Sequence, residues 1–133
     1  MEITLVFVYN SDGGLFNGLR NWAHKIVAPS TYPCSLHALS YGTLGIHSEW
    51  RSFVDSLPVG TRFYHRDEFH RRYGKLQEPL PAVFLQVDNQ VEVWITTEDL
   101  KRLNILDELI ILVRRKLAAT LDERGWTSLK VSA

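Results

Sequence analysis

Hydrophobic positions along this chain form short β-branched runs that alternate with stretches of helical spacing. Residues 3–9 are a continuous apolar run, which predicts a central strand buried on both faces. Residues 82–87 and 91–95 form two further runs, and the polar turn 88–90 between them predicts a β-hairpin. Pro81 stands directly before this hairpin, at a position where a strand needs no backbone N–H donor.

Helical spacing of apolar residues predicts four helices between and after these strands. The expected capping residues are Ser11 or Asp12, Ser48, Asp67 and Asn104, because short polar side chains accept hydrogen bonds from first-turn amides. A helix-stopping residue follows each helix in turn: Pro29, Pro58, Gly74 and Gly125. The chain therefore alternates strands with helices, which is typical of an α/β domain.

The second strand of the sheet has two candidates, residues 35–41 and residues 62–65. In the first case Cys34 starts a core strand. In the second case Cys34 lies in a long loop or a short helix between two helices. The periodicity of the sequence does not decide between them.

Composition limits the class of protein. The 133 residues correspond to one domain, 1–133, and 45% hydrophobic residues are ordinary for a soluble globular protein. Lys plus Arg and Asp plus Glu both number 15, and this zero net charge argues against nucleic-acid binding. A single cysteine suits a reducing compartment, and the start of the chain has no basic leader. No apolar run approaches the roughly 20 residues of a membrane span, so we expect a cytoplasmic protein without membrane insertion.

The order strand, helix, strand, helix, proline, hairpin, helix resembles the thioredoxin-like fold over most of the chain. The resemblance implies a mixed central sheet flanked by helices. In that family a cis-proline opens the third strand and faces the loop after the first strand. Pro81 is the matching residue, and we therefore expect it beside the loop 10–14. An ordinary trans proline at the start of a strand is the alternative.

The chain departs from the thioredoxin family at the redox motif. Thioredoxins carry Cys-x-x-Cys after the first strand, where helix amides lower the pKa of a thiol. This chain has Asn10-Ser11-Asp12-Gly13-Gly14 there, so we expect no dithiol exchange. If residues 35–41 were the second strand, Cys34 would lie at the opposite end of the sheet from Pro81.

Three motifs are similar to those of a family of small bacterial proteins with no established function. They lie at 9–15, 28–42 and 65–69. Members of that family often read Cys-x-Leu-Cys where this chain reads Cys34-Ser35-Leu36-His37. The resemblance implies no activity.

Cys34 and His37 are the strongest candidates for chemistry. Both residue types bind zinc or iron, but two ligands are half of a tetrahedral shell, and no second pair has recognisable spacing. His37 is also a possible base for a reactive thiol. The third interpretation is a buried free cysteine beside a hydrogen-bonded histidine. The sequence indicates no particular cofactor.

Asn10, Ser11 and Asp12 follow the first strand, where open α/β sheets usually bind ligands, although simple helix capping explains the same residues. The triplet His65-Arg66-Asp67 is similar to the catalytic loop of protein kinases. The chain lacks the other kinase motifs, so we interpret the triplet as a strand end followed by an Asp-capped helix. Trp126 follows the last helix and is a candidate contact with a partner or a second copy.

Two functions are consistent with these features. The first is a small cytosolic binding or accessory protein without dithiol chemistry, which binds a protein partner or small ligand near Asn10, Ser11, Asp12 and Pro81. The alternative is a single-thiol redox protein or metal-linked protein that acts through Cys34 and His37.

Overall fold

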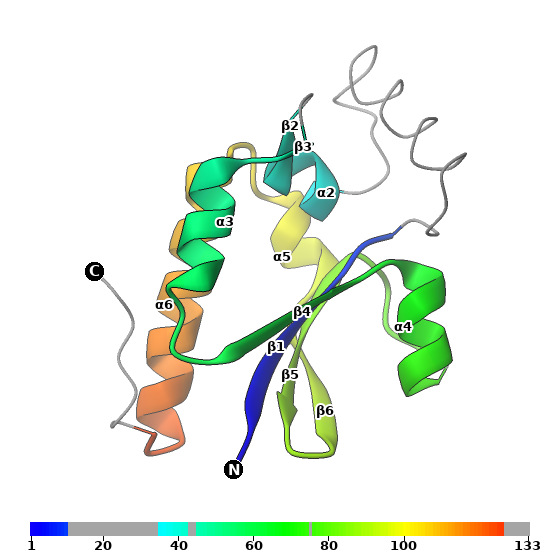
Figure 1. Cartoon of the computed structure of the whole chain (residues 1–133), viewed down its shortest axis with the longest axis vertical. Helices are drawn as coiled ribbons and strands as arrows, with labels where there is room; N and C mark the ends of the chain where they lie inside the picture. The colour runs from blue at the N-terminus through cyan, green and yellow to red at the C-terminus, as the bar shows by residue number, and fades with distance from the viewer. Residues whose placement is uncertain (11–34, 43–44, 75, 127–133) are drawn as a thin grey trace.

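The computed structural model describes residues 1–10, 35–42, 45–74 and 76–126 (Figure 1). The predicted first helix, Ser11, Asp12 and Cys34 lie outside these residues. His37 lies inside them in the backbone only, because its side chain is not described.

Four strands form a mixed sheet in the order β4-β1-β5-β6. They are β1 (Ile3–Val8), β4 (Gly60–Tyr64), β5 (Ala82–Val87) and β6 (Gln90–Ile95). β1 is parallel to β4 and antiparallel to β5, and β5 is antiparallel to β6. The predicted mixed α/β sheet, its central first strand and the hairpin are confirmed. Every residue of β1 is buried, since β1 has a neighbouring strand on each side and helices on both faces.

Of the two candidates for the second strand, residues 62–65 are the correct one, since residues 62–64 lie in β4, and the alternative at 35–41 is wrong. Residues Ser35–Ser40 form the helix α2, and two-residue strands follow it, β2 (Tyr41–Gly42) and β3 (Gly45–Ile46). Leu36 and Leu39 are three positions apart and both buried, as on one face of a helix. The Ser40 hydroxyl donates a 2.8 Å hydrogen bond to the carbonyl of Leu36, one turn earlier. Residues 35–40 therefore form a helix instead of a strand, because helical spacing buries both leucines on one side.

Helices cover the two faces of the sheet unequally (Figure 1). α3 and α6 lie side by side on one face, together with α2 and α5, and α4 lies on the other. The bounds are α3 Ser48–Asp55, α4 Arg66–Tyr73, α5 Thr97–Lys101 and α6 Leu106–Glu123. Leu5 and Phe7 of β1 belong to the larger core cluster under α3 and α6. Val6 and Val8 belong to the smaller cluster with Phe69 of α4.

Three of the described helices begin at residues other than those predicted. α3 has His47 as its N-cap, and the predicted cap Ser48 is its first residue. α4 has His65 as its N-cap, and Asp67 is its second residue. α6 begins at Leu106 after the N-cap Ile105, where the Glu108 carboxylate accepts from the backbone N–H groups of Asn104 and Ile105 at 2.9 and 3.2 Å. In α4 and α6 a glutamate three residues after the N-cap accepts hydrogen bonds from backbone N–H groups at the helix start, so a polar N-cap side chain is not needed there.

The predicted C-terminal stop of α4 is confirmed. Gly74 has a φ of +83°, in the region that favours glycine, and a Cβ there would meet nothing within 4 Å. The constraint at Gly74 is therefore the backbone conformation itself. Trp126 is half-buried against the larger core cluster, and the Arg124 guanidinium lies 5.5 Å from its ring.

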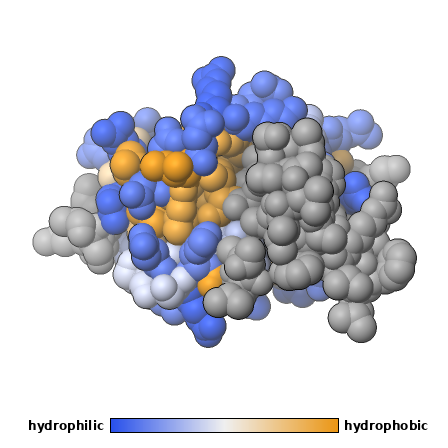
Figure 2. Space-filling model, turned by 90° about the horizontal axis from the view of Figure 1, so that it is seen from above, coloured by the Kyte–Doolittle hydropathy of each residue, from blue (hydrophilic) through white to orange (hydrophobic). Residues whose placement is uncertain are grey.

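Apolar surface is visible at the end of the molecule where β1 finishes. Figure 2 views this end and shows apolar atoms bordered by hydrophilic ones. The loop before α6 lies at this end (Figure 1), and its Ile105 is 56% exposed. An exposed apolar region beside polar groups is a common feature of binding surfaces.

Candidate functional site

Three chain segments meet at the end of the sheet where β1 finishes. Val8 pairs with Tyr64 of β4 on one side and with Ala82 of β5 on the other. The backbone N–H of Tyr9 extends the first pairing with a 2.9 Å hydrogen bond to the carbonyl of Tyr64. Asn10 lies two residues after Val8, His65 directly follows Tyr64, and Pro81 directly precedes Ala82. The structure therefore places Asn10 and Pro81 at the same end of the sheet, as the sequence predicted.

Pro81 is a buried residue at this end of the sheet. The Leu80–Pro81 peptide is cis, so the first of the two predicted alternatives is correct. Pro81 is buried, and its carbonyl accepts a 2.5 Å hydrogen bond from the hydroxyl of Thr97, the first residue of α5. Pro81 therefore fixes the start of β5 against α5, and the exposed atoms of the site come from its neighbours.

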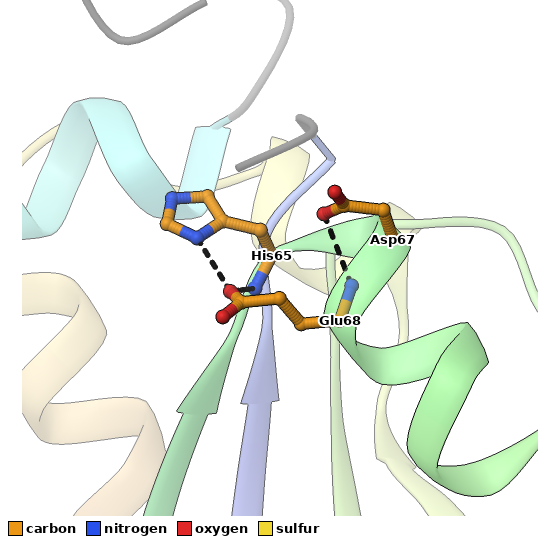
Figure 3. Close-up of polar contacts among 3 residues, drawn as sticks. All are labelled: His65, Asp67 and Glu68. Carbon is orange, nitrogen blue, oxygen red and sulfur yellow. Dashed lines mark hydrogen bonds and ion pairs between the residues drawn. The ribbon is translucent and has the colours of Figure 1, made fainter. Parts of the chain in front are cut away.

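His65 and Glu68 form the best-defined polar pair at this end (Figure 3). The imidazole Nδ1 lies 2.7 Å from Glu68 Oε1, and the same oxygen accepts the backbone N–H of His65 at 2.9 Å. The side chains of His65 and Glu68 are 40% and 44% exposed, so water reaches both groups. The neighbouring Asp67 accepts the backbone N–H of Glu68 at 3.0 Å.

These hydrogen bonds favour the charged form of Glu68. The backbone N–H of His65 contributes most to lowering the pKa of the Glu68 carboxyl below its usual 4.5, and the His65 side chain adds to the effect. Glu68 is therefore an anion at neutral pH. A carboxylate only accepts hydrogen bonds, so Nδ1 of His65 carries the proton of this contact.

The arrangement orients the imidazole of His65. In a neutral ring with Nδ1–H directed at Glu68, Nε2 keeps its lone pair, and Figure 3 shows Nε2 on the side of the ring away from Glu68. The ring also lies against Tyr9, with 5.5 Å between the centroids and 46° between the planes. The imidazole of His65 is therefore held in place by Glu68 and Tyr9, with Nε2 directed away from Glu68.

Asn10 and Arg66 connect β1 to the start of α4. Arg66 Nη1 donates to Asn10 Oδ1 across 3.4 Å, which is long for a hydrogen bond. Asn10 is half-buried, so this predicted ligand-binding residue also has a structural contact. The predicted partners Ser11 and Asp12 lie outside the described residues.

Cys34 lies outside the described residues and the side chain of His37 is not described, so neither candidate is placed relative to this site. The described part of α2 runs from Ser35 to Ser40, and its Leu36 and Leu39 share a core cluster with Tyr9. Figure 1 shows α2 at the end of the sheet where β1 finishes. The inference that Cys34 lies at the opposite end from Pro81 depended on a strand at 35–41, and it fails with that strand. Within the described residues, no three His, Cys, Asp or Glu side chains are close enough to hold a metal ion.

Sequence reasoning interpreted His65 only as part of a strand end and missed its pairing with Glu68. The signal that could have found it is the spacing, because residues i and i+3 at a helix start form a reciprocal capping box. Histidine is not among the usual N-cap residues, so the sequence pattern favours Asp67 as the cap instead.

Comparison of the chain with protein-family models, curated proteins and solved structures finds no match in any of the three. The thioredoxin-like resemblance and the resemblance to small bacterial proteins therefore stay predictions. None of the described helices combines the length and the apolar character that crossing a bilayer requires.

Proposed function

We propose that this chain is a small thioredoxin-like binding protein that works without dithiol chemistry. Its ligand or partner binds at the end of the sheet where Asn10, His65 and Glu68 lie, above the buried Pro81. The observation that carries the proposal is the convergence of three chain segments there around an oriented, half-exposed imidazole.

The strand order supports the thioredoxin-like assignment. β4, the second strand of the sheet in chain order, lies on one side of β1. The third and fourth, β5 and β6, lie on the other side of β1. α3 and α6 are on one face and α4 on the other, and a cis proline precedes the third strand. Each of these features agrees with the fold that the element order resembles.

The composition of the site supports binding over dithiol exchange. The chain has one cysteine, so two thiols cannot meet at this end of the sheet. The polar groups that the structure describes there include an amide, an imidazole, carboxylates and the Arg66 guanidinium, which bind ligands through hydrogen bonds. Apolar surface at the same end of the molecule (Figure 2) offers a contact for a protein partner or for the carbon body of a small ligand. The single cysteine also favours a cytoplasmic setting.

A single-thiol function through Cys34 and His37 is the second candidate. The described part of α2, Ser35–Ser40, lies at the Pro81 end of the sheet, and Cys34 directly precedes it in the sequence. This function requires that Cys34 reacts with a disulfide or an electrophile.

Two measurements test the proposal. Insulin reduction with dithiothreitol should proceed at the uncatalysed rate, and turnover that disappears in Cys34→Ser would support the single-thiol function instead. In parallel, ¹⁵N NMR spectra should be recorded while a panel of short extended peptides and small imidazole-binding acids is added. The proposal expects saturable shifts concentrated at Asn10, at 65–68 and at 80–82. Saturable shifts that avoid these residues would contradict it.

A further inference from the structure

A second surface, on the helical face of the sheet, has features of a small-molecule site. α3 and α6 lie side by side there (Figure 1), and a groove of about 450 Å³ runs between them. The groove is largely open to solvent, and its volume lies within the range of about 300–1,000 Å³ that small-molecule sites occupy. The groove lies away from His65 and Glu68, so its function is independent of the one proposed above.

The α3 side of the groove is a line of hydroxyl groups. Ser48, Ser52 and Ser56 are spaced four residues apart and therefore lie on one face of the helix. The Ser56 hydroxyl, at the C-terminal end of this line, donates a 2.6 Å hydrogen bond to the carbonyl of Phe53. The exposed hydroxyls of Ser48 and Ser52 are available to a ligand as donors or acceptors.

The α6 side contributes Arg114, whose charge has no ion-pair partner among the described residues. Its guanidinium carbon lies 5.3 Å from the ring of Phe53, so the face of the ring holds the cation in the groove. Its Nε–H is buried and has no acceptor in the described part of the chain.

The remaining lining residues restrict the ligand. Phe53 and Ile110 are apolar and can contact a carbon body. Glu49 also lines the groove, and its negative charge opposes anionic ligands, most strongly those that carry more than one negative charge. A ligand with one anionic group and an apolar body fits these three residues better than inorganic phosphate or a polyanion.

We propose that the α3–α6 groove binds a small organic monocarboxylate. The carboxylate pairs with the Arg114 guanidinium and accepts a hydrogen bond from Ser52, and the apolar body lies against Phe53 and Ile110. An arginine–carboxylate pair is directional as well as charged, because the planar guanidinium presents parallel donors.

Three probes separate charge from apolar contact. Benzoate has both features, acetate has the charge alone, and benzamide has the ring without the charge. Each is titrated into the full chain while amide resonances of 48–56 and 110–114 and the Arg114 Nε–H resonance are followed by ¹⁵N NMR. The proposal expects saturable shifts with benzoate, weaker binding of acetate and no saturation with benzamide. Equal shifts with benzamide and benzoate would overturn the role of Arg114.

Matched variants test the same contact. Arg114→Gln should weaken benzoate binding by about tenfold or more, the loss expected for one charge-assisted pair. Arg115→Gln removes the same charge from the exposed neighbouring position and should leave the dissociation constant within about twofold. Equal losses in both variants would show general charge attraction and contradict a built site. Arg114→Lys keeps the charge without the planar donors, and full binding by that variant would contradict the directional pairing.

Discussion

The indole Nε1–H of Trp94 donates a 2.9 Å hydrogen bond to the hydroxyl of Thr120, and both groups are buried. The bond connects the edge strand β6 to the last turns of α6, 26 residues later in the chain. It allows a large ring to enter the core without an unpaired donor. The C-terminal helix is therefore joined to the sheet by a directional contact as well as by apolar packing.

Thr120→Val should destabilise the protein by about 1–3 kcal/mol, because the shape is kept while the indole N–H loses its acceptor. Urea unfolding followed by circular dichroism measures the change. Thr61→Val on β4 is the control, since Thr61 is half-exposed, and the change there should stay within about 0.5 kcal/mol. Equal effects of the two substitutions would show that the Trp94 contact contributes nothing specific.

Thr97→Val should also lower the free energy of unfolding, by about 1–2 kcal/mol, because it removes the donor to the buried carbonyl of Pro81. Thr97→Ser retains the hydroxyl and should lose less. The amide resonances of Asn10 and Ala82 should shift in the valine variant, since Pro81 is at their end of the sheet. Unchanged resonances there would contradict a connection between α5 and the candidate site.

Most of the sheet could be predicted from sequence because its strands are distinctive. β1 is buried on both faces and therefore reads as a continuous apolar run. α2 could not be predicted in the same way, because its six residues carry only Leu36 and Leu39 as a spacing signal. A segment that short fits a strand or a helix about equally well, and tertiary contacts decide which of the two forms.

The candidate site could be predicted only in part. Pro81 was located from its place before the hairpin, but cis and trans forms before proline differ by only about 0.5–1 kcal/mol, so local sequence does not select one. The contact between Asn10 and Arg66 joins residues 56 positions apart, and it depends on the register between β1 and β4. No periodicity within either segment carries that information.

Glu68→Gln should reduce stability by up to about 1 kcal/mol at neutral pH, because exposed pairs contribute little and this carboxylate is 44% exposed. The pKa of Glu68 is lowered in the folded state, so its contribution is present above the usual value of 4.5 and is lost as the pH falls through the folded value. The difference between wild type and variant should therefore vanish in strong acid.

Urea unfolding at pH 7 and near pH 2.5 measures this difference. Glu98→Gln is the matched control, because Glu98 also lies in the first turn of a helix, α5, and shares the dipole effect without the histidine. A loss that is the same at both pH values, or the same in both variants, would contradict a specific role for the His65 contact.

Cys34→Ala should be tolerated, with a loss of about 1 kcal/mol or less, because it deletes one small sulfur and leaves a small void. A structural metal would give a different result, since metal-binding free energy is also folding free energy. Thermal melts of wild type and variant, each with and without a chelator, separate the cases. If chelator and substitution each lower the melting temperature strongly and their effects do not add, Cys34 is a metal ligand. If neither has an effect, the rate of alkylation by iodoacetamide near neutral pH decides between a reactive thiol and a packing residue. Fast alkylation that slows in His37→Ala would favour the single-thiol function, and slow alkylation in both would favour the binding function.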